Sequence, residues 1–342
     1  MLPVSFVQLA IGALLISASS PAHRAGGSPQ QLHSNARASI RMADEARPEV
    51  AVMMNGLPGA MGLEIAAASL RREGVTLAPF ALTGPGMGGE VACDDGRGGA
   101  AVTVQLYEPA AMDELAARAL AEYPEAGSLV CVDFTAPSAV NGNAEWYAAN
   151  KLPFVMGTTG GDREALLSCM MDSGTYAVIA PNMAKQIVAL QAALQQMATD
   201  FPGSFDGYSL SVVESHQSTK ADTSGTAKAI SASLATLTAE ADYTNDDIVR
   251  VREPAEQLAG GGTSHSGCSP VSEGALKGHA FHTYSLVSAD KAVEFQFRHN
   301  VEGRSTYAEG TVDAVAFLAR RITDAADKRV YDMVDVLKAG AM

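Results

Sequence analysis

The sequence lacks the features that mark nucleic-acid-binding, zinc-binding and membrane-spanning proteins. Its 24 lysines and arginines stand against 38 aspartates and glutamates and form no long basic cluster, so nucleic acid is not an expected partner. Its four cysteines are widely scattered, with no Cys-x-x-Cys pair and no Cys/His ligand spacing. We therefore expect no metal site. The length and composition are those of a soluble globular protein with two domains.

The first 43 residues contain no acidic side chain. They hold three arginines, many serines and alanines, and one apolar run, VSFVQLAIGALLIS, which is too short and too interrupted for a membrane-spanning helix. An apolar run followed by an acid-poor, Ser/Ala/Arg-rich segment is typical of a signal region joined to a transit peptide. Residues 1–45 are therefore predicted to be a disordered targeting leader, and the mature protein is expected in the plastid stroma with no membrane anchor. The alternative is an undirected disordered tail.

From residue 49, apolar strands alternate with helical segments. Apolar runs such as EVAVMMN (49–55) and SLVCVDFT (128–135) are separated by stretches of helical composition such as GLEIAAASLRREG (62–74), and TLAPFALTG is a further strand candidate. Strands that are apolar throughout predict a parallel sheet covered on both faces. The fold class is therefore α/β, with a Rossmann-like dinucleotide-binding domain at 46–182 that is completed by residues 303–342.

The pattern changes after residue 182. KQIVALQAALQQMATDF predicts an amphipathic helix, and KAVEFQFRHNV alternates Val293, Phe295 and Phe297 with polar residues. A period of two suits an antiparallel sheet with one covered face. Residues 183–302 are therefore predicted to form an α+β domain, which contains a polar, mobile Gly/Ser loop at 259–274.

The segment NGLPGAMG follows a predicted buried strand and opens a helix, which is the setting of a dinucleotide-binding turn. Gly56 allows the tight turn, Gly59 lets a pyrophosphate approach the backbone, and Gly62 permits close packing of helix on strand. The helix N-terminus offers free N–H groups to the phosphates. The GxxGxxG spacing departs from GxGxxG, so an ordinary glycine turn is the alternative.

The acidic residue that usually binds the ribose 2′-hydroxyl is missing. About 20 residues after the turn the sequence reads ALTGPG, with Thr83 and Gly84 in place of a carboxylate. The missing charge removes a repulsion against a 2′-phosphate and favours NADPH. No arginine stands beside these residues, so NADH stays possible.

Two further loops end predicted strands. GTTG contains Gly157, Thr158 and Thr159, and APNMAK contains Pro181 and Asn182. In an open α/β sheet the ligand crevice lies at the carboxyl ends of the strands, so both loops are predicted to line it near the nicotinamide. The alternative is that they are plain turns.

The stretch VVESHQSTKADTSGTAKAI places polar groups around the start of a predicted helix. Ser224 stands at the N-cap, and the turn that it begins offers hydroxyls and free backbone N–H groups to an anion. Lys220 adds a positive charge or a proton, and His216 titrates near neutrality and can donate a proton. These groups suit one small acidic ligand, whereas a capped helix beside a surface histidine is the alternative.

These residues resemble dihydrodipicolinate reductase, the nicotinamide-dependent reductase of lysine biosynthesis, in its plant type. The resemblance runs from about residue 49 to about residue 325 and is carried, in order, by NGLPGAMG, VDFT, PFVMGTTGGDRE, ESHQSTKADTSGTAKA, GHAFHTY and HNVEGRSTYAEGTVDAV. It implies hydride transfer from NAD(P)H to a cyclic imine-type dicarboxylate, which gives tetrahydrodipicolinate. It also implies that the C-terminal domain binds this substrate and builds the oligomer, a homodimer or a homotetramer.

The resemblance assigns roles to residues of this chain. It makes His216 the catalytic proton donor and Lys220 the residue that holds and protonates the substrate. Substrate contacts are expected from Gln217, Ser224, Gly225, Thr226 and Arg304, although Arg304 could instead bridge the domains. Cofactor contacts are expected from the two motifs and the two loops, namely Gly56, Gly59, Ala60, Met61, Gly62, Thr83, Gly157, Thr158, Thr159, Pro181 and Asn182.

Some positions stay open. The bacterial pattern has a second histidine directly after the catalytic one. Here that position is Gln217, and the plant-type pattern also has glutamine there. His279 and His282 could reach the substrate or be packing residues, and His299, on the covered side of its strand by parity, is interpreted as structural. A reductase of another small acid, or a dinucleotide-binding protein without activity, are the alternative functions.

Overall fold

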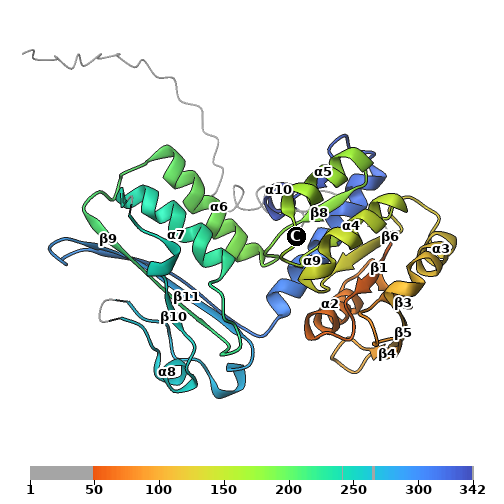
Figure 1. The fold of residues 1–342 in the computed structure, drawn as a ribbon, viewed down its shortest axis with the longest axis horizontal. Helices are drawn as coiled ribbons and strands as arrows, with labels where there is room; N and C mark the ends of the chain where they lie inside the picture. The colour runs from red at the N-terminus through yellow and green to blue at the C-terminus, as the bar shows by residue number, and fades with distance from the viewer. Residues whose placement is uncertain (1–48, 241, 264–265, 341–342) are drawn as a thin grey trace, which may run out of the picture. The chain divides into compact units, whose positions relative to one another are not determined.

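The computed structural model describes residues 49–240, 242–263 and 266–340, so the predicted leader lies outside the described residues. Every helix in these ranges is too short or too polar to cross a membrane. Figure 1 shows an N-terminal and a C-terminal part, which are joined where the chain passes from β8 to α6 and where it returns from β12 to α9.

The N-terminal part is a parallel six-stranded sheet in the order β13-β8-β7-β6-β1-β2. All residues of β1, β6, β7 and β8 are buried, which confirms the prediction of a sheet covered on both faces. The strands are β1 (Val50–Asn55), β2 (Val75–Leu77), β6 (Leu129–Asp133), β7 (Phe154–Met156), β8 (Ala177–Ile179) and β13 (Val330–Tyr331).

Helices cover the two faces of this sheet with separate apolar cores. One face packs against α2 (Ala60–Arg71), α9 (Ser305–Thr323) and α10 (Met333–Lys338). The other packs against α3 (Met112–Glu122), α4 (Val140–Ala149) and α5 (Arg163–Ser173). Residues from the C-terminal end of the chain therefore contribute both a strand and a helical layer to the Rossmann-like domain.

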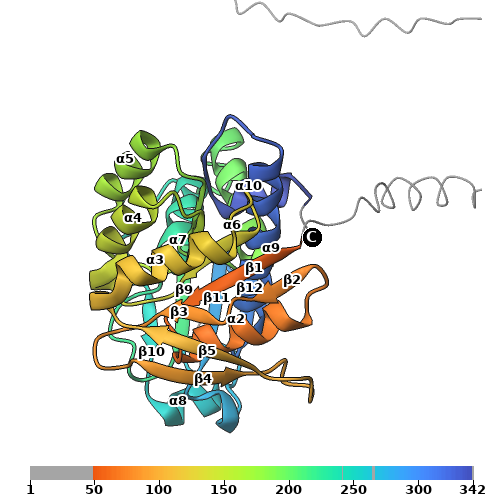
Figure 2. The same ribbon diagram turned by 90° about the vertical axis from the view of Figure 1, so that its right-hand side faces the viewer.

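A small three-stranded sheet follows β2 and lies next to α2 (Figure 2). It consists of β3 (Phe80–Leu82), β5 (Val102–Tyr107) and β4 (Gly89–Cys93) in that order. The segment TLAPFALTG, expected as one strand, is divided between the two sheets at Pro79. Proline has no N–H to continue a hydrogen-bonded ladder, which accounts for the break.

The C-terminal part is a mixed four-stranded sheet in the order β10-β9-β11-β12. Its strands are β9 (Tyr208–His216), β10 (Val249–Val251), β11 (His279–Ser288) and β12 (Glu294–Glu302). The long helices α6 (Lys185–Asp200) and α7 (Gly225–Thr238) lie on one face, and the short α8 (Pro254–Ala259) lies on the other (Figure 1). Single 3₁₀ turns occur at Pro109–Ala111, Pro137–Ala139, Asn245–Asp247 and Glu273–Ala275.

Two expectations for this sheet need correction. On the edge strand β12 the predicted alternation holds for Phe297, which is partly buried, but Phe295 on this strand and Val293 just before it are exposed. The Gly/Ser loop, predicted to be polar and mobile, is partly buried, and its mobility stays a prediction. Its residues Cys268 and Val271 are buried against the sheet face opposite α7.

Helix α9 crosses the junction between the two parts at a glycine. A Cβ atom added to Gly310 would overlap the backbone carbonyl of Met183, in the connection from β8 to α6. Three residues on, the buried Asp313 binds Arg72 Nη2 at 2.6 Å and Lys185 Nζ at 2.5 Å. The helix, the end of α2 and the start of α6 are thus fixed to one another.

We predict that Gly310→Ala lowers the free energy of unfolding by about 1–3 kcal/mol, the usual cost of overpacking, although alanine favours a helix over glycine by up to about 1 kcal/mol. Gly142→Ala is the matched control, because Gly142 is an exposed residue of α4 and no described atom lies within 4 Å of a Cβ built there. That variant should be equal to wild type or more stable. Urea unfolding curves measure both, and equal effects would contradict the proposed contact.

Candidate active site

The glycine turn between β1 and α2 is shaped for close approach of a ligand. Gly56 has a φ of +104°, and a side chain on it would overlap the backbone of Phe134. A Cβ on Gly59 would lie 2.8 Å from the Gly56 carbonyl oxygen. Among the described residues no side chain caps the start of α2, so the N–H groups of Ala60 and Met61 are free to bind an anion. These features fit a dinucleotide pyrophosphate.

Gly62 and Thr83 lie behind this turn. A Cβ on Gly62 would be 3.4 Å from the Leu57 side chain, which agrees with a packing role. Thr83 is buried, and its hydroxyl donates to the Leu57 carbonyl oxygen at 2.6 Å. In this arrangement its side chain stabilises the turn.

A buried carboxylate holds the loop after β7, and sequence reasoning missed it. Asp133, the last residue of β6, accepts hydrogen bonds at 2.7 Å from the Thr158 hydroxyl and at 2.8 Å from the Thr135 hydroxyl. Asn143 and Tyr147 donate to its second oxygen, both at 2.9 Å. A carboxylate that ends an otherwise apolar strand was the available signal.

The loops after β7 and β8 come to the same edge of the sheet. Gly157 packs against the Phe134 ring, which leaves no room for a side chain, while Thr159 and Pro181 are exposed. Asn182 Nδ2 donates to Thr226 Oγ1 at 3.0 Å, across from the β8 end to the start of α7. The predicted cofactor loop and the predicted substrate turn are therefore in direct contact.

Helix α7 begins at Gly225, as predicted, but Ser224 does not cap it in the expected way. Among the described residues the Ser224 side chain makes no cap hydrogen bond; its backbone N–H donates to Glu214 Oε2 at 3.0 Å. No described atom lies within 4 Å of a Cβ built on Gly225. The first turn of α7, with Thr226, keeps N–H and hydroxyl groups for an anion.

Lys220 lies in the loop between β9 and α7, which also contains the partly buried Gln217. Its Nζ binds Asp222 Oδ1 at 2.7 Å, and this hydrogen bond lowers the pKa of the Asp222 carboxyl. Arg252 Nε donates to the Lys220 carbonyl oxygen at 2.9 Å and fixes the loop. Asp222 and Arg252 were not identified from the sequence.

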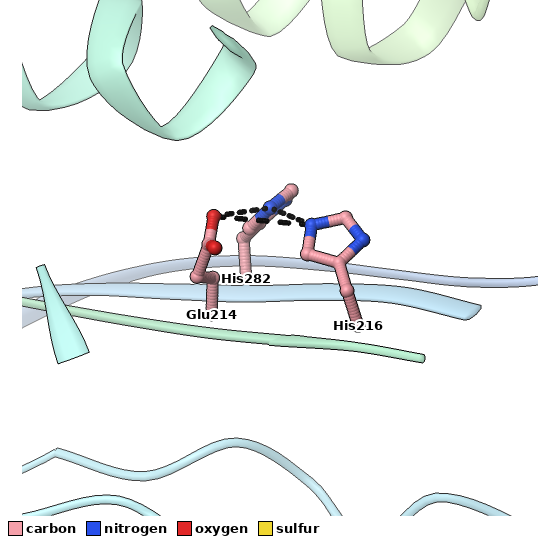
Figure 3. Close-up of side chains that lie close together, drawn as sticks. All are labelled: Glu214, His216 and His282. Carbon is pink, nitrogen blue, oxygen red and sulfur yellow. Dashed lines mark hydrogen bonds and ion pairs between the residues drawn. The ribbon is translucent and has the colours of Figure 1, made fainter. Parts of the chain in front are cut away.

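Glu214 forms the centre of a buried cluster with two histidines (Figure 3). His216 Nε2 lies 3.1 Å from His282 Nε2, and Glu214 Oε2 lies 3.8 Å and 3.7 Å from these two atoms. Glu214 Oε1 is bound by Arg252. The three residues could offer ligand atoms to a metal, but the ring contact, the Ser224 N–H and the Arg252 pair already use these atoms. We interpret the cluster as a hydrogen-bonded network.

The network sets the charge of each member. Burial alone would raise the pKa of Glu214, but the nearby His282, hydrogen bonds from Arg252 and the Ser224 N–H, and the nearby His216 together lower it to about 2. Burial, followed by the influence of His282, lowers the pKa of His216 to about 3. At neutral pH the cluster therefore holds one carboxylate and uncharged imidazoles.

The residues that the sequence left open occupy different places. His279 contacts Ser215 Oγ at 2.9 Å and the Ala275 carbonyl at 3.0 Å, on the sheet face opposite to His282. Arg304 is exposed at the start of α9, with its guanidinium beside Gly278. Tyr307 follows in the first turn of α9, and burial raises its pKa.

Comparison with known proteins agrees with this arrangement. The models of the dihydrodipicolinate reductase N-terminus and C-terminus match residues 50–183 and 186–337. The chain is 42% identical over 322 residues to the probable chloroplastic 4-hydroxy-tetrahydrodipicolinate reductase 2 of Oryza sativa subsp. japonica, with 94% of this chain and 93% of that protein covered. It is 44% identical over 293 residues to the chloroplastic reductase 2 of Arabidopsis thaliana, with 86% and 78% covered.

A solved structure shows the same fold. Dipicolinate-bound dihydrodipicolinate reductase from Paenisporosarcina sp. TG-14 matches with a TM-score of 0.53 at 18% identity, over 83% of this chain and 97% of that chain. This likeness supports the fold alone. The assignment to a family depends on the two family models and the plant relatives. On their strength, the chain belongs to the dihydrodipicolinate reductase family.

Proposed function

We propose that this chain catalyses the NAD(P)H-dependent reduction of 4-hydroxy-tetrahydrodipicolinate to tetrahydrodipicolinate, in lysine biosynthesis through diaminopimelate. The observation that carries the proposal is the Asn182–Thr226 hydrogen bond. It joins the carboxyl edge of the parallel sheet, where an α/β fold binds its cofactor, to a helix start that suits a carboxylate. A hydride donor and an anionic acceptor held at these two places are neighbours.

The cofactor is proposed to bind along the Gly56–Gly59 turn, with its pyrophosphate at the free N–H groups of α2 and its nicotinamide near Gly157, Thr159 and Pro181. When bound, the reduced nicotinamide supplies the hydride. The segment after β3 brings no carboxylate to the ribose, so NADPH is the favoured cofactor and NADH the second.

The substrate carries two carboxylates and therefore needs more than one anion site. The first turn of α7 provides one through Gly225 and Thr226, and Lys220 provides a cation beside it. Gln217 can add a neutral hydrogen bond, and Arg304 is a candidate for a second carboxylate or for a bridge between the domains. His216 is proposed to give the proton that accompanies the hydride.

The proton donor must be charged before it can act. The pKa of His216 is lowered to about 3, so His216 is uncharged at pH 7 in the free protein. Two substrate carboxylates nearby favour the charged imidazolium and raise this pKa. The chemistry of the site therefore couples substrate binding to proton uptake.

The mature enzyme is placed in the plastid, in agreement with the chloroplastic names of its plant relatives. We further propose that residues 183–302 bind the substrate and assemble a homodimer or homotetramer. Residues 46–182 together with 303–342 form the dinucleotide-binding domain in this proposal.

The full chain is expected to oxidise NADPH rapidly, and NADH more slowly, when dihydrodipicolinate synthase generates the unstable substrate in the assay. The rate should depend on the synthase. A folded chain that binds NADPH but oxidises none would reject the proposed substrate, and the function would then be reduction of another small acid or dinucleotide binding without turnover.

Lys220→Ala is expected to lower kcat by roughly 10²- to 10⁴-fold, because it removes both a cation and a positioned proton donor. NADPH affinity should stay nearly unchanged, since the glycine turn is elsewhere. Lys338→Ala, which removes an exposed lysine from α10, is the control and should match wild type. A large loss of NADPH binding in Lys220→Ala would place this lysine at the cofactor instead.

Binding of dipicolinate to the NADPH-bound full chain is expected to take up protons, and to take up more of them at pH 6 than at pH 8, because the substrate carboxylates raise the pKa of His216 towards the lower pH. Because the complex binds more protons than the free protein, its affinity should increase as the pH is lowered from 8 to 6. Calorimetry in two buffers of different ionisation enthalpy measures the uptake. His216→Gln should abolish it, and uptake that persists in this variant would assign the proton to another group.

A further inference from the structure

The strand register aligns ionisable side chains across the mixed sheet. His282 of β11 pairs with Glu214 of β9 on one side and with His299 of β12 on the other. His216 is two residues beyond Glu214 and therefore lies on the same face. The result is a row of four groups on the face covered by α7.

Two direct contacts join the three rings. His282 Nε2 lies 3.1 Å from His216 Nε2, and His282 Nδ1 lies 3.1 Å from His299 Nε2. Burial lowers the pKa of all three imidazoles, so each carries one proton at neutral pH. Each contact needs an N–H on one ring and a lone pair on the other. Since His282 has only one N–H, both hydrogen bonds must run in the same direction.

Two features of His299 bear on the direction: the Tyr284 hydroxyl lies 3.5 Å from its Nε2 and accepts or donates according to the direction, and its outer nitrogen Nδ1 decides between the two directions. Within the described residues, His299 Nδ1 is buried and has no hydrogen-bond partner. If the chain ran from His216 to His299, the His299 proton would occupy Nδ1 and leave a buried N–H without an acceptor. If it runs from His299 to His216, Nδ1 carries only a lone pair. Buried N–H groups without partners are rarer than unpaired acceptors, which favours the second direction.

The charged groups around His216 hold the chain in place without choosing its direction. Glu214 Oε2 is within 3.8 Å of both Nε2 atoms, so either direction puts one N–H near the carboxylate. Arg252 neutralises that carboxylate, and Lys220 is paired with Asp222.

We propose that His282 and His299 are positioning residues that hold His216 as its Nδ1–H tautomer, with this N–H directed to the substrate. The proposal rests on the role of His216 in the proposed function. In Figure 3 the second ring nitrogen of His216 points away from Glu214 and His282. Gln257 Nε2 also donates to the His216 carbonyl oxygen at 2.6 Å, which fixes the backbone that carries the ring.

The chain must reverse when His216 becomes charged. Its second proton occupies Nε2, which then donates to His282 Nε2, while His282 Nδ1–H donates to His299 Nε2. The Nε2 protons of His299 and His282 each move one ring along the chain, and the one proton taken up is bound at His299 Nδ1, so the three rings then hold four protons. Delivery of the Nδ1 proton to the substrate leaves His216 neutral, with its proton on Nε2. The reversed chain contains the partnerless N–H of His299, which keeps His216 neutral until the substrate carboxylates are present.

The first test is the tautomer of His216 in the full chain at pH 7. Histidine labelled with ¹⁵N in the ring distinguishes protonated from unprotonated nitrogens, and loss of signals in His216→Gln and His299→Gln assigns them. We expect His216 to be protonated at Nδ1 and His299 at Nε2. A wild-type spectrum with His216 protonated at Nε2 would overturn the proposal.

The second test varies His299. His299→Gln keeps an amide N–H for His282 Nδ1, so the Nδ1–H tautomer of His216 and most of kcat should remain. His299→Leu removes this donor, so His216 should shift towards the Nε2–H form, and kcat should decrease roughly 10- to 100-fold with KM nearly unchanged. His279→Gln, on the opposite face of the sheet, is the control. An unchanged tautomer and kcat in His299→Leu would contradict the positioning role.

The two proposals fail in different ways. If the wild-type chain shows the Nδ1–H tautomer but no reductase activity, the substrate is wrong and the histidine chain stands. If activity is present and the tautomer is Nε2–H, the function stands and the positioning proposal is wrong. Should His299→Leu not fold, the wild-type spectrum and the His299→Gln variant still decide the matter.

Discussion

The arrangement of the candidate site depends on the buried carboxylate of Glu214. A buried charge without partners is strongly destabilising, so a fold that places a glutamate inside the sheet must bring donors to it. Arg252 comes from the end of β10 and the Ser224 N–H from the start of α7, and the two histidine rings lie 3.7 and 3.8 Å away. Satisfying this one group therefore places the helix start that would hold the substrate, the loop with Lys220, and the imidazole of His216 within one small region.

The two parts of the chain are joined by contacts that tolerate little change. Gly310 has no room for a side chain against Met183, and Asp313 binds cations from α2 and α6. Close to this junction, Asn182 reaches Thr226. The glycine turn that suits the cofactor and the helix start that suits the substrate are consequently supported by the same packed interface, which is what a hydride transfer between two separately bound molecules requires.

Much of this could be predicted from the sequence because it depends on local patterns. Apolar strands, the glycine turn after β1 and the segment around His216 each specify their own structure. The histidine chain could not be found in this way, because it depends on the pairing of β9, β11 and β12 over long separations. One signal was available: His279 and His282 are three apart in a strand, so they must point to opposite faces. Asp133 and Arg252 were missed because each acts through partners distant in sequence.

The pairing of Lys220 with Asp222 has a consequence for how an anion enters the site. The chain has a net charge of −14, which repels a dianion at long range. If Lys220 binds a substrate carboxylate as proposed, that carboxylate replaces the exposed Asp222 side chain, which can turn to water. Asp222 stays two residues away in the same loop, so Lys220 exchanges one carboxylate partner for another and need not be stripped of a full hydration shell. In the proposed site Asp222 therefore competes with the substrate for Lys220 and is at hand to pair with the lysine again when a carboxylate product leaves.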